Sequence, residues 1–294
     1  METGNRKFRT EVLLSLLVLA ALLISIAVLR DPIAGKPAFA LEKKDADTNN
    51  QPKQKESKQK DKKSARPEHN HPAFTERVKE RETMVARHIQ TRDVRDPNVL
   101  RTMRTVPRHA FVRPSDLYRA YRNHPLPIGL NQTISQPSLV AYMTEALKLN
   151  LKLKILEIGT GSGYQAAVCA EIVQEVYTIE ILEELAKSAK ERLKELGYRN
   201  VSVKAADGYF GWKEKGPFDA IIVTCAAGFV PPPLIEQLKP DGKMILPVGS
   251  PFGAQWLVLI TKDDKGKVRS KELFPVRFVP MVGQIRKAKR PPEK

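Results

Sequence analysis

The hydrophobic pattern divides the chain into parts of different character. An apolar run covers residues 12–29, a polar stretch with almost no apolar side chains covers 41–72, and short apolar segments recur throughout 73–284. The final residues, 285–294, are mostly charged residues and proline. The apolar run predicts a targeting segment in residues 1–40. Segments with few apolar side chains cannot form a core, so we predict a disordered Lys/Gln-rich linker in 41–72 and a basic tail in 285–294. The recurring apolar segments predict a folded domain in 73–284.

The leading apolar run has two interpretations. Its length of about 18 residues is just enough to cross a bilayer, whereas Ala38-Phe39-Ala40 resembles the small-residue pattern of a signal cleavage site. Basic residues lie on both sides of the run, so the charge rule for orientation gives no answer. We expect a chain that is membrane-anchored or exported, with membrane association through residues 12–29. A cytoplasmic location is the alternative.

Helical spacing begins at Phe74. Val78, Met84, Val85 and Ile89 can share one face of a helix. A second short helix is predicted from Asp96-Pro97, and a third covers Ser138 to Leu149. In the second helix we expect the inward-facing residues to be Val99, Leu100 and Met103.

The remainder of the chain alternates strands with helices. We predict strands over 154–158, 176–180, 201–205, 219–224 and 243–247, and helices over 164–173, 183–196 and 233–238. A final hairpin joins 256–261 to 269–274. This order predicts an α/β fold: a doubly wound, mostly parallel sheet with a helical N-terminal extension and an antiparallel edge hairpin.

Charge and cysteine content narrow the choice of partners. The formal net charge of +17 suggests nucleic acid or an anionic membrane, but the basic residues are spread along the chain and form no basic helix with interleaved aromatics. We therefore expect no specific nucleic-acid site.

Cys169 and Cys225 lie far apart in apolar surroundings and are predicted to be buried free thiols. His69 and His71 are predicted to be solvated, and we expect no metal site.

A glycine-rich turn follows the strand predicted at 154–158. Glycines there permit a tight turn and let a ligand approach the backbone at the carboxyl end of the strand. Glu180 ends the next strand, where a carboxylate can accept hydrogen bonds from ribose hydroxyls, and Asp207-Gly208 follows the third strand. The residues of the turn that we expect to contact a nucleotide are Gly159, Thr160, Gly161, Ser162 and Gly163.

Glu157 distinguishes between two kinds of nucleotide. Residues 161–166 fit the loose G-x-G-x-x-A pattern of a dinucleotide site, which would indicate a dehydrogenase. A carboxylate beside the turn would repel a pyrophosphate and attract a sulfonium cation. The pattern E-x-G-x-G-x-G from Glu157 resembles the first motif of Rossmann-like S-adenosylmethionine methyltransferases, and Asp207-Gly208 resembles the acidic turn that takes the adenine amino group in that class. The resemblance implies S-adenosyl-L-methionine as cofactor.

The segment Gly129-Leu130-Asn131-Gln132-Thr133-Ile134-Ser135-Gln136-Pro137 carries a more specific resemblance. Together with Val106-Pro107-Arg108, residues 232–240 and residues 275–283, it resembles the protein-L-isoaspartate O-methyltransferase family from about residue 96 to 283. Two departures are Asn131, where the family often has a small residue, and Cys225-Ala226-Ala227-Gly228, where Ala-Ala-Pro is common.

The resemblance implies methyl transfer to the free carboxylate of L-isoaspartyl residues in damaged proteins and peptides, with repair through a succinimide. It implies that Ser135 is the catalytic residue and that Gln132, Thr133 and Ile134 lie at the cofactor. Residue types alone favour a polar turn in which Ser135 caps the helix that follows. A carboxylate acceptor is already anionic at neutral pH, so orientation rather than a strong general base is expected to supply catalysis.

Other functions remain as alternatives. A nucleic-acid amino methyltransferase would carry Asn/Asp-Pro-Pro-aromatic after the fourth strand, where this chain has Thr224-Cys225-Ala226-Ala227. Another Rossmann-like methyltransferase, or a non-catalytic S-adenosylmethionine-binding module at a membrane, would keep the glycine turn with a different acceptor or none.

Overall fold

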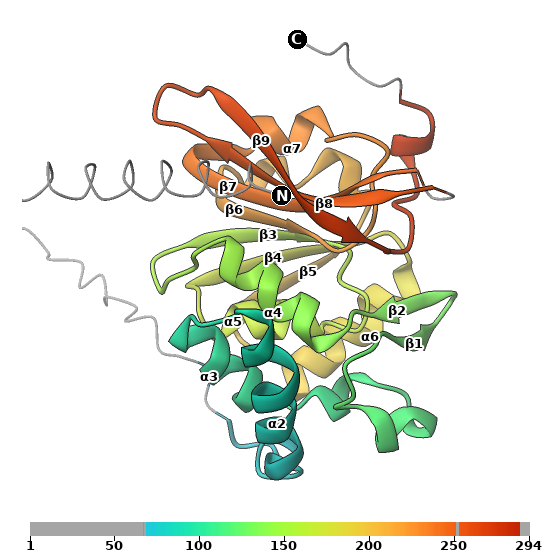
Figure 1. The fold of residues 1–294 in the computed structure, drawn as a ribbon. Coiled ribbons are helices and arrows are strands. Elements are labelled where there is room, and N and C mark those ends of the chain that lie inside the picture. The colour runs from blue at the N-terminus through green and yellow to red at the C-terminus, as the bar shows by residue number, and fades with distance from the viewer. Residues whose placement is uncertain (1–66, 68, 251–252, 289–294) are drawn as a thin grey trace, which may run out of the picture. The chain divides into compact units, whose positions relative to one another are not determined.

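The computed structural model describes residues 67, 69–250 and 253–288 (Figure 1). The predicted targeting segment, most of the predicted linker and the end of the basic tail lie outside the described residues. Among the described residues, none of the helices has the length and apolar character needed to span a membrane.

A seven-stranded sheet forms the centre of the domain, in the order β5-β4-β3-β6-β7-β8-β9. The strands from β5 to β7 run parallel, and β8 and β9 add an antiparallel hairpin at one edge, as predicted. Their bounds are β3 Lys154–Ile158, β4 Glu175–Glu180, β5 Val201–Ala205, β6 Phe218–Val223, β7 Leu238–Gly249, β8 Gln255–Lys262 and β9 Val268–Val276.

Helices between the parallel strands make the crossovers that a parallel sheet requires. Helix α4 (Pro137–Ala146) precedes β3, and α5 (Tyr164–Ala170), α6 (Glu183–Glu195) and α7 (Pro232–Glu236) follow β3, β4 and β6. Gly197 has φ +86° just beyond α6, where a left-handed residue ends a helix without steric cost. Strands β3 and β5 have their predicted bounds, whereas α5 and α7 are shorter than predicted and β7 is longer.

The N-terminal extension packs beside this sheet and is helical, as predicted. It contains a 3₁₀ turn (Pro72–Phe74), α2 (Val78–Met84), a π-helical turn (Val85–Ile89), α3 (Pro97–Thr105) and further 3₁₀ turns over 90–92, 108–111 and 114–119. The Asp96 side chain caps α3 by accepting hydrogen bonds from the N–H groups of Asn98 and Val99. Val78 was predicted to share one helix face with Met84, Val85 and Ile89, but it is 40% exposed whereas the other three are buried.

Two hydrophobic clusters cover the two faces of the sheet. Alternation along β3 sends Ile155 to the face covered by α4 and α5, and Leu156 and Ile158 to the opposite face. Burial of each such side chain contributes about 1.5–3 kcal/mol to folding.

Described residues just beyond both predicted domain limits pack against the domain. His69 was expected to be solvated at the end of a linker, but its Nε2 lies 2.8 Å from Oε1 of Glu171 and its ring stacks on Phe74. His71 accepts a hydrogen bond from the N–H of Ala73 and caps the first 3₁₀ turn. At the other end, Ile285 is buried in a core cluster, so the domain does not stop at 284.

Candidate active site

A cavity opens at the carboxyl ends of the parallel strands. From β3 the chain adds β4 and β5 on one side of the sheet and then β6 and β7 on the other. The cavity lies at this switch point, which is the usual place for a ligand in a doubly wound sheet. Its lining includes these residues from the sequence prediction: Gln132, Thr133, Ile134, Ser135, Gly159, Thr160, Gly161, Ser162, Glu180 and Gly208.

The glycine turn after β3 needs its glycines for conformation and for space. Gly159, Gly161 and Gly163 all have positive φ, at +95°, +52° and +90°. A Cβ on Gly159 would lie 2.5 Å from Oγ1 of Thr224. The N–H groups of Gly159 and Thr160 both donate to the carbonyl of Ile179, at 2.8 and 3.2 Å, which fixes the turn against β4. Gly163 does not line the cavity; its Cβ position faces Leu193 of α6.

Glu180 presents a buried carboxylate to the cavity from the end of β4. Its Oε2 accepts a hydrogen bond from the N–H of Gly161 at 2.8 Å, and its Oε1 accepts one from the N–H of Leu182 at 3.0 Å. A carboxylate has about four acceptor positions, so lone pairs are left for ligand hydroxyls.

Glu157, which was predicted to bind the cofactor, is not among the residues that line the cavity. Alternation along β3 points Ile158 into the cavity and Glu157 to the other face, where it is fully buried. The Oγ1 of Thr178 donates to its Oε2 at 2.5 Å, and Thr178 is itself 2.6 Å from the hydroxyl of Thr160 in the glycine turn. Burial raises the pKa of Glu157 to about 8, so its neutral form is favoured at pH 7. Glu157 therefore supports the turn from behind.

Asp207 also lies outside the cavity lining. Its Oδ1 accepts from the N–H of Tyr209 at 2.9 Å, capping a 3₁₀ turn over 208–210, and its Oδ2 accepts from the N–H of Gln284 at 2.6 Å. The carboxylate thus holds the C-terminal segment. Only Gly208 of this acidic turn reaches the cavity.

An unpredicted hairpin carries the Thr-Ile-Ser segment. Strands β1 (Leu126–Gly129) and β2 (Gln132–Ile134) pair, and the two residues that join them, Leu130 and Asn131, have φ +48° and +56°. Such a turn requires positive φ at both positions, and asparagine tolerates this conformation better than most residues. The departure at Asn131 therefore suits the turn.

Ser135 follows β2 and lines the cavity. The interpretation of Ser135 as a helix cap is wrong, because the N-cap of α4 is Gln136 and no side-chain hydrogen bond caps that end. The hairpin also approaches the glycine turn, since a Cβ on Gly161 would lie 3.2 Å from Cδ1 of Ile128. The structure thus places the serine and the glycine turn around one cavity.

Two residues after β6 also line the cavity, although neither was predicted to belong to the site. Thr224 and Cys225 line it, and the Thr224 hydroxyl donates to the carbonyl of Gly159 at 2.6 Å. Their place in the site could have been predicted, because they follow the carboxyl end of the strand beside β3, where doubly wound sheets bind ligands. Burial raises the pKa of the Cys225 thiol to about 12, so it stays protonated near neutral pH. Both cysteines are free, as predicted, but only Cys169 is fully buried, because Cys225 lines the cavity.

A C-terminal segment, residues 279–282, closes the remaining side of the cavity. It is pinned to the loop after β6 by a hydrogen bond from the N–H of Ala226 to the carbonyl of Val279, at 2.8 Å, and by one from the N–H of Met281 to the carbonyl of Ala226, at 2.7 Å. No cluster of three or more metal-ligating side chains occurs in the described part of the chain.

Comparison with known families shows which family this chain and its cavity belong to. The sequence model of the protein-L-isoaspartate(D-aspartate) O-methyltransferase family matches residues 79–286. The chain belongs to this family. The match covers the glycine turn, the β1–β2 hairpin and the C-terminal segment, and therefore every part of the cavity.

Relatives of the methyltransferase support the assignment along the same region. Protein-L-isoaspartate O-methyltransferase 2 of Syntrophobacter fumaroxidans is 57% identical over 188 residues, covering 64% of this chain and 76% of the relative. Protein-L-isoaspartate O-methyltransferase of Gloeobacter violaceus is 52% identical over 198 residues, covering 67% of this chain and 96% of the relative.

Solved structures of such methyltransferases share the fold. A protein-L-isoaspartate O-methyltransferase superposes with a TM-score of 0.64 at 28% identity, covering 70% of this chain and 67% of the other. A Plasmodium falciparum protein described as a member of the same family, solved with S-adenosyl-L-homocysteine, gives a TM-score of 0.58 at 25% identity, covering 70% of this chain and 97% of the other.

S-adenosylmethionine is the cofactor of this methyltransferase, and the cavity fits it. Residues Gly159 to Ser162 of the glycine turn line the cavity, so a ligand can lie against their backbone. Glu180 offers carboxylate oxygens for ribose hydroxyls at the neighbouring strand end. The rest of the lining is largely apolar, with Ile158, Ile179, Ile181 and Met281, which suits a flat adenine ring.

Proposed function

We propose that this chain methylates the free α-carboxylate of L-isoaspartyl residues in damaged proteins and peptides. One observation carries the proposal: Ser135, on the segment that the resemblance assigns to the acceptor, lines the same cavity as Glu180 and the glycine turn. A methyl acceptor held at the serine would therefore lie beside the donor.

On the donor side, the residues of the chain would bind and orient S-adenosylmethionine. Glu180 would hold the ribose hydroxyls while its contact with the N–H of Gly161 keeps the turn in place. Glu157, through Thr178 and Thr160, supports the same turn from the buried face of the sheet. When bound, S-adenosylmethionine supplies a methyl group on a cationic sulfur.

On the acceptor side, the nucleophile needs no deprotonation, because a carboxylate is already ionised at pH 7. Ser135 makes no side-chain hydrogen bond that is recorded among the described residues, so its hydroxyl is available to donate to one carboxylate oxygen. The other oxygen would then face the methyl group. Alignment of this kind can lower the activation barrier by on the order of 7–11 kcal/mol in favourable cases.

A carboxylate bound in the cavity would be partly shielded from bulk water. Thr133 and Ile134 on the hairpin and the segment 279–282 line the cavity and would surround the acceptor. Bulk water would stabilise the carboxylate and weaken it as a nucleophile. In the methyl ester that leaves the enzyme, a backbone amide nitrogen would attack the ester carbonyl and expel methanol to form a succinimide, which water reopens in part to normal aspartate.

The test uses purified protein, labelled S-adenosylmethionine and a matched pair of peptides that contain either isoaspartate or aspartate at one position. We expect base-labile label in the isoaspartyl peptide alone. Equal labelling of both peptides would remove the specificity, and no labelling of either would support a non-catalytic binding module.

We also propose that residues 12–29 associate this enzyme with a membrane or direct its export. The support is the apolar run itself and the basic residues around it. Fractionation and protease accessibility in intact cells test the proposal. A full-length, protease-protected protein in the soluble fraction would contradict it.

A further inference from the structure

Residues 69–77 form a strap that lies before residue 79, where the family match begins. Arg81 holds the strap from inside the domain. Its guanidinium is 2% exposed and donates to the carbonyls of Phe74 at 2.5 Å, Glu76 at 2.6 Å and Ala73 at 3.3 Å, while its Nε donates to the carbonyl of Arg104 at 2.7 Å. A buried cation with this set of carbonyl partners fixes the backbone of the strap.

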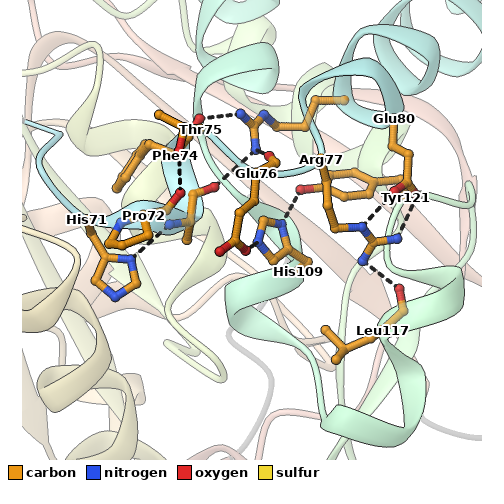
Figure 2. Close-up of polar contacts among 12 residues, drawn as sticks. His71, Pro72, Phe74, Thr75, Glu76, Arg77, Glu80, His109, Leu117 and Tyr121 are labelled. Atoms are coloured by element: carbon orange, nitrogen blue, oxygen red, sulfur yellow. Dashed lines mark hydrogen bonds and ion pairs between the residues drawn. The ribbon is translucent and has the colours of Figure 1, made fainter.

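The strap then reaches a second segment of the chain through Glu76 (Figure 2). Oε2 of Glu76 lies 3.2 Å from Nε2 of His109, and Nδ1 of His109 lies 2.6 Å from the hydroxyl of Tyr121. A carboxylate only accepts hydrogen bonds, so Nε2 carries the proton in the neutral ring and Nδ1 accepts from Tyr121. Both nitrogens of His109 are thus engaged.

Arg77 adds a parallel connection between the same segments. Its Nη1 donates to the carbonyl of Leu117 at 2.7 Å, and its guanidinium lies 5.1 Å from the centre of the Tyr121 ring (Figure 2). Glu80 orients this guanidinium through hydrogen bonds of 2.7 and 2.6 Å. The strap therefore fixes Tyr121 through its ring as well as its hydroxyl.

Tyr121 leads directly to the hairpin that carries the acceptor residues. Two residues further on, Oδ1 of Asn123 accepts a hydrogen bond from the N–H of Ser138 at 3.0 Å, in the first turn of α4. Strand β1 starts at Leu126, which is paired with Ile134. The segment from Tyr121 to Leu126 is thus held at its start by the strap and at its end by the strand that precedes Ser135.

We propose that Glu76 and His109 are positioning residues for the methyl acceptor: through Tyr121, the strap sets the placement of the β1–β2 hairpin. Glu76, which lies before the family match, would thereby influence the acceptor site from a distance. This inference rests on the proposed methylation of isoaspartyl peptides. It assigns no contact with substrate to the strap itself.

The test compares single variants of the full chain. Glu76→Ala removes the acceptor for His109, Glu76→Gln keeps a carbonyl oxygen there, and Glu82→Ala changes an exposed glutamate on α2 with no side-chain hydrogen bond recorded among the described residues. Tyr121→Phe removes one hydroxyl and keeps the buried ring. Measured for each are kcat and KM for the isoaspartyl peptide, Kd for S-adenosylhomocysteine, and Tm.

We expect Glu76→Ala and Tyr121→Phe to raise KM for the peptide on the order of three- to tenfold. The Kd for S-adenosylhomocysteine should rise less, because Glu180 and the glycine turn stay in place while only the hairpin wall of the cavity moves. Glu76→Gln should restore KM to within about twofold of the wild type. The inference is overturned if KM in Glu76→Ala and Tyr121→Phe equals that of Glu82→Ala, or if Kd rises as much as KM. A wild-type chain that labels no peptide would instead refute the proposed function.

Discussion

Glu180 and Gly161 are joined by a hydrogen bond of 2.8 Å between a carboxylate oxygen and a backbone N–H. This contact connects the end of β4 to the glycine turn after β3, and both residues line the cavity. Both partners belong to the protein, so this hydrogen bond restrains the turn that faces the donor, and a restrained turn loses less freedom on binding.

Glu180→Ala should weaken S-adenosylhomocysteine binding by about ten- to a hundredfold, because a hydrogen bond to a charged group contributes about 1.5–3 kcal/mol. Isothermal calorimetry measures the change. Glu184→Ala, at an exposed position early in α6, is the matched control and should bind as the wild type does. An unchanged Kd in Glu180→Ala would contradict the ribose-binding role.

Ser135→Ala should lower kcat for the isoaspartyl peptide by about ten- to a thousandfold, the range for loss of one orienting donor. The Kd for S-adenosylhomocysteine should stay the same, because the donor side does not depend on this hydroxyl. Ser202→Ala, on the exposed part of β5, provides the control. Wild-type turnover in Ser135→Ala would show that the serine has no part in catalysis.

Gly159→Ala and Gly266→Ala separate conformational strain from close packing. Both glycines have positive φ, at +95° and +79°, but a Cβ on Gly159 meets Thr224 whereas one on Gly266 meets nothing within 4 Å. Left-handed strain costs about 1–2 kcal/mol in either variant. Urea unfolding should therefore show a larger loss for Gly159→Ala, and equal losses would mean that the turn can shift away from Thr224.

The buried Glu157 predicts a specific dependence of stability on pH. Its pKa is raised from 4.5 when unfolded to about 8 when folded, so the folded state keeps a proton that the unfolded state has released. Its contribution to the free energy of unfolding therefore falls as pH rises through this window and levels off above pH 8. Between pH 6 and 9, wild type should lose on the order of 2 kcal/mol more than Glu157→Gln. Parallel curves would contradict the assigned burial effect.

The parallel core of the fold was predictable because its strands are short apolar runs that end in distinctive turns. Strands β3 and β5 have the predicted bounds, and Glu180 lies where the rule for doubly wound sheets places a ligand. The hairpin of β1 and β2 was missed because its strands are very short and contain Pro127, which weakens any strand pattern.

Side-chain roles were harder to predict than strand positions. Glu157 was assigned to the ligand by its motif, but the two-residue period of β3 already points it away from the side that Ile158 lines. Asp207 could not be placed from the sequence, because its partner Gln284 lies in a C-terminal segment that returns to the site only in the folded chain. Likewise, His69 finds Glu171 through tertiary packing and not through local sequence.

Conversion of a damaged peptide tests the account most directly. An isoaspartyl peptide is incubated with the full chain and S-adenosylmethionine, and chromatography follows the isoaspartyl, succinimide and aspartyl forms over time. We predict loss of the isoaspartyl form and growth of the aspartyl form, with conversion by Ser135→Ala slowed in proportion to its lower kcat. An isoaspartyl fraction that stays constant while the methyl donor is consumed, or that falls equally without donor, would contradict the assignment.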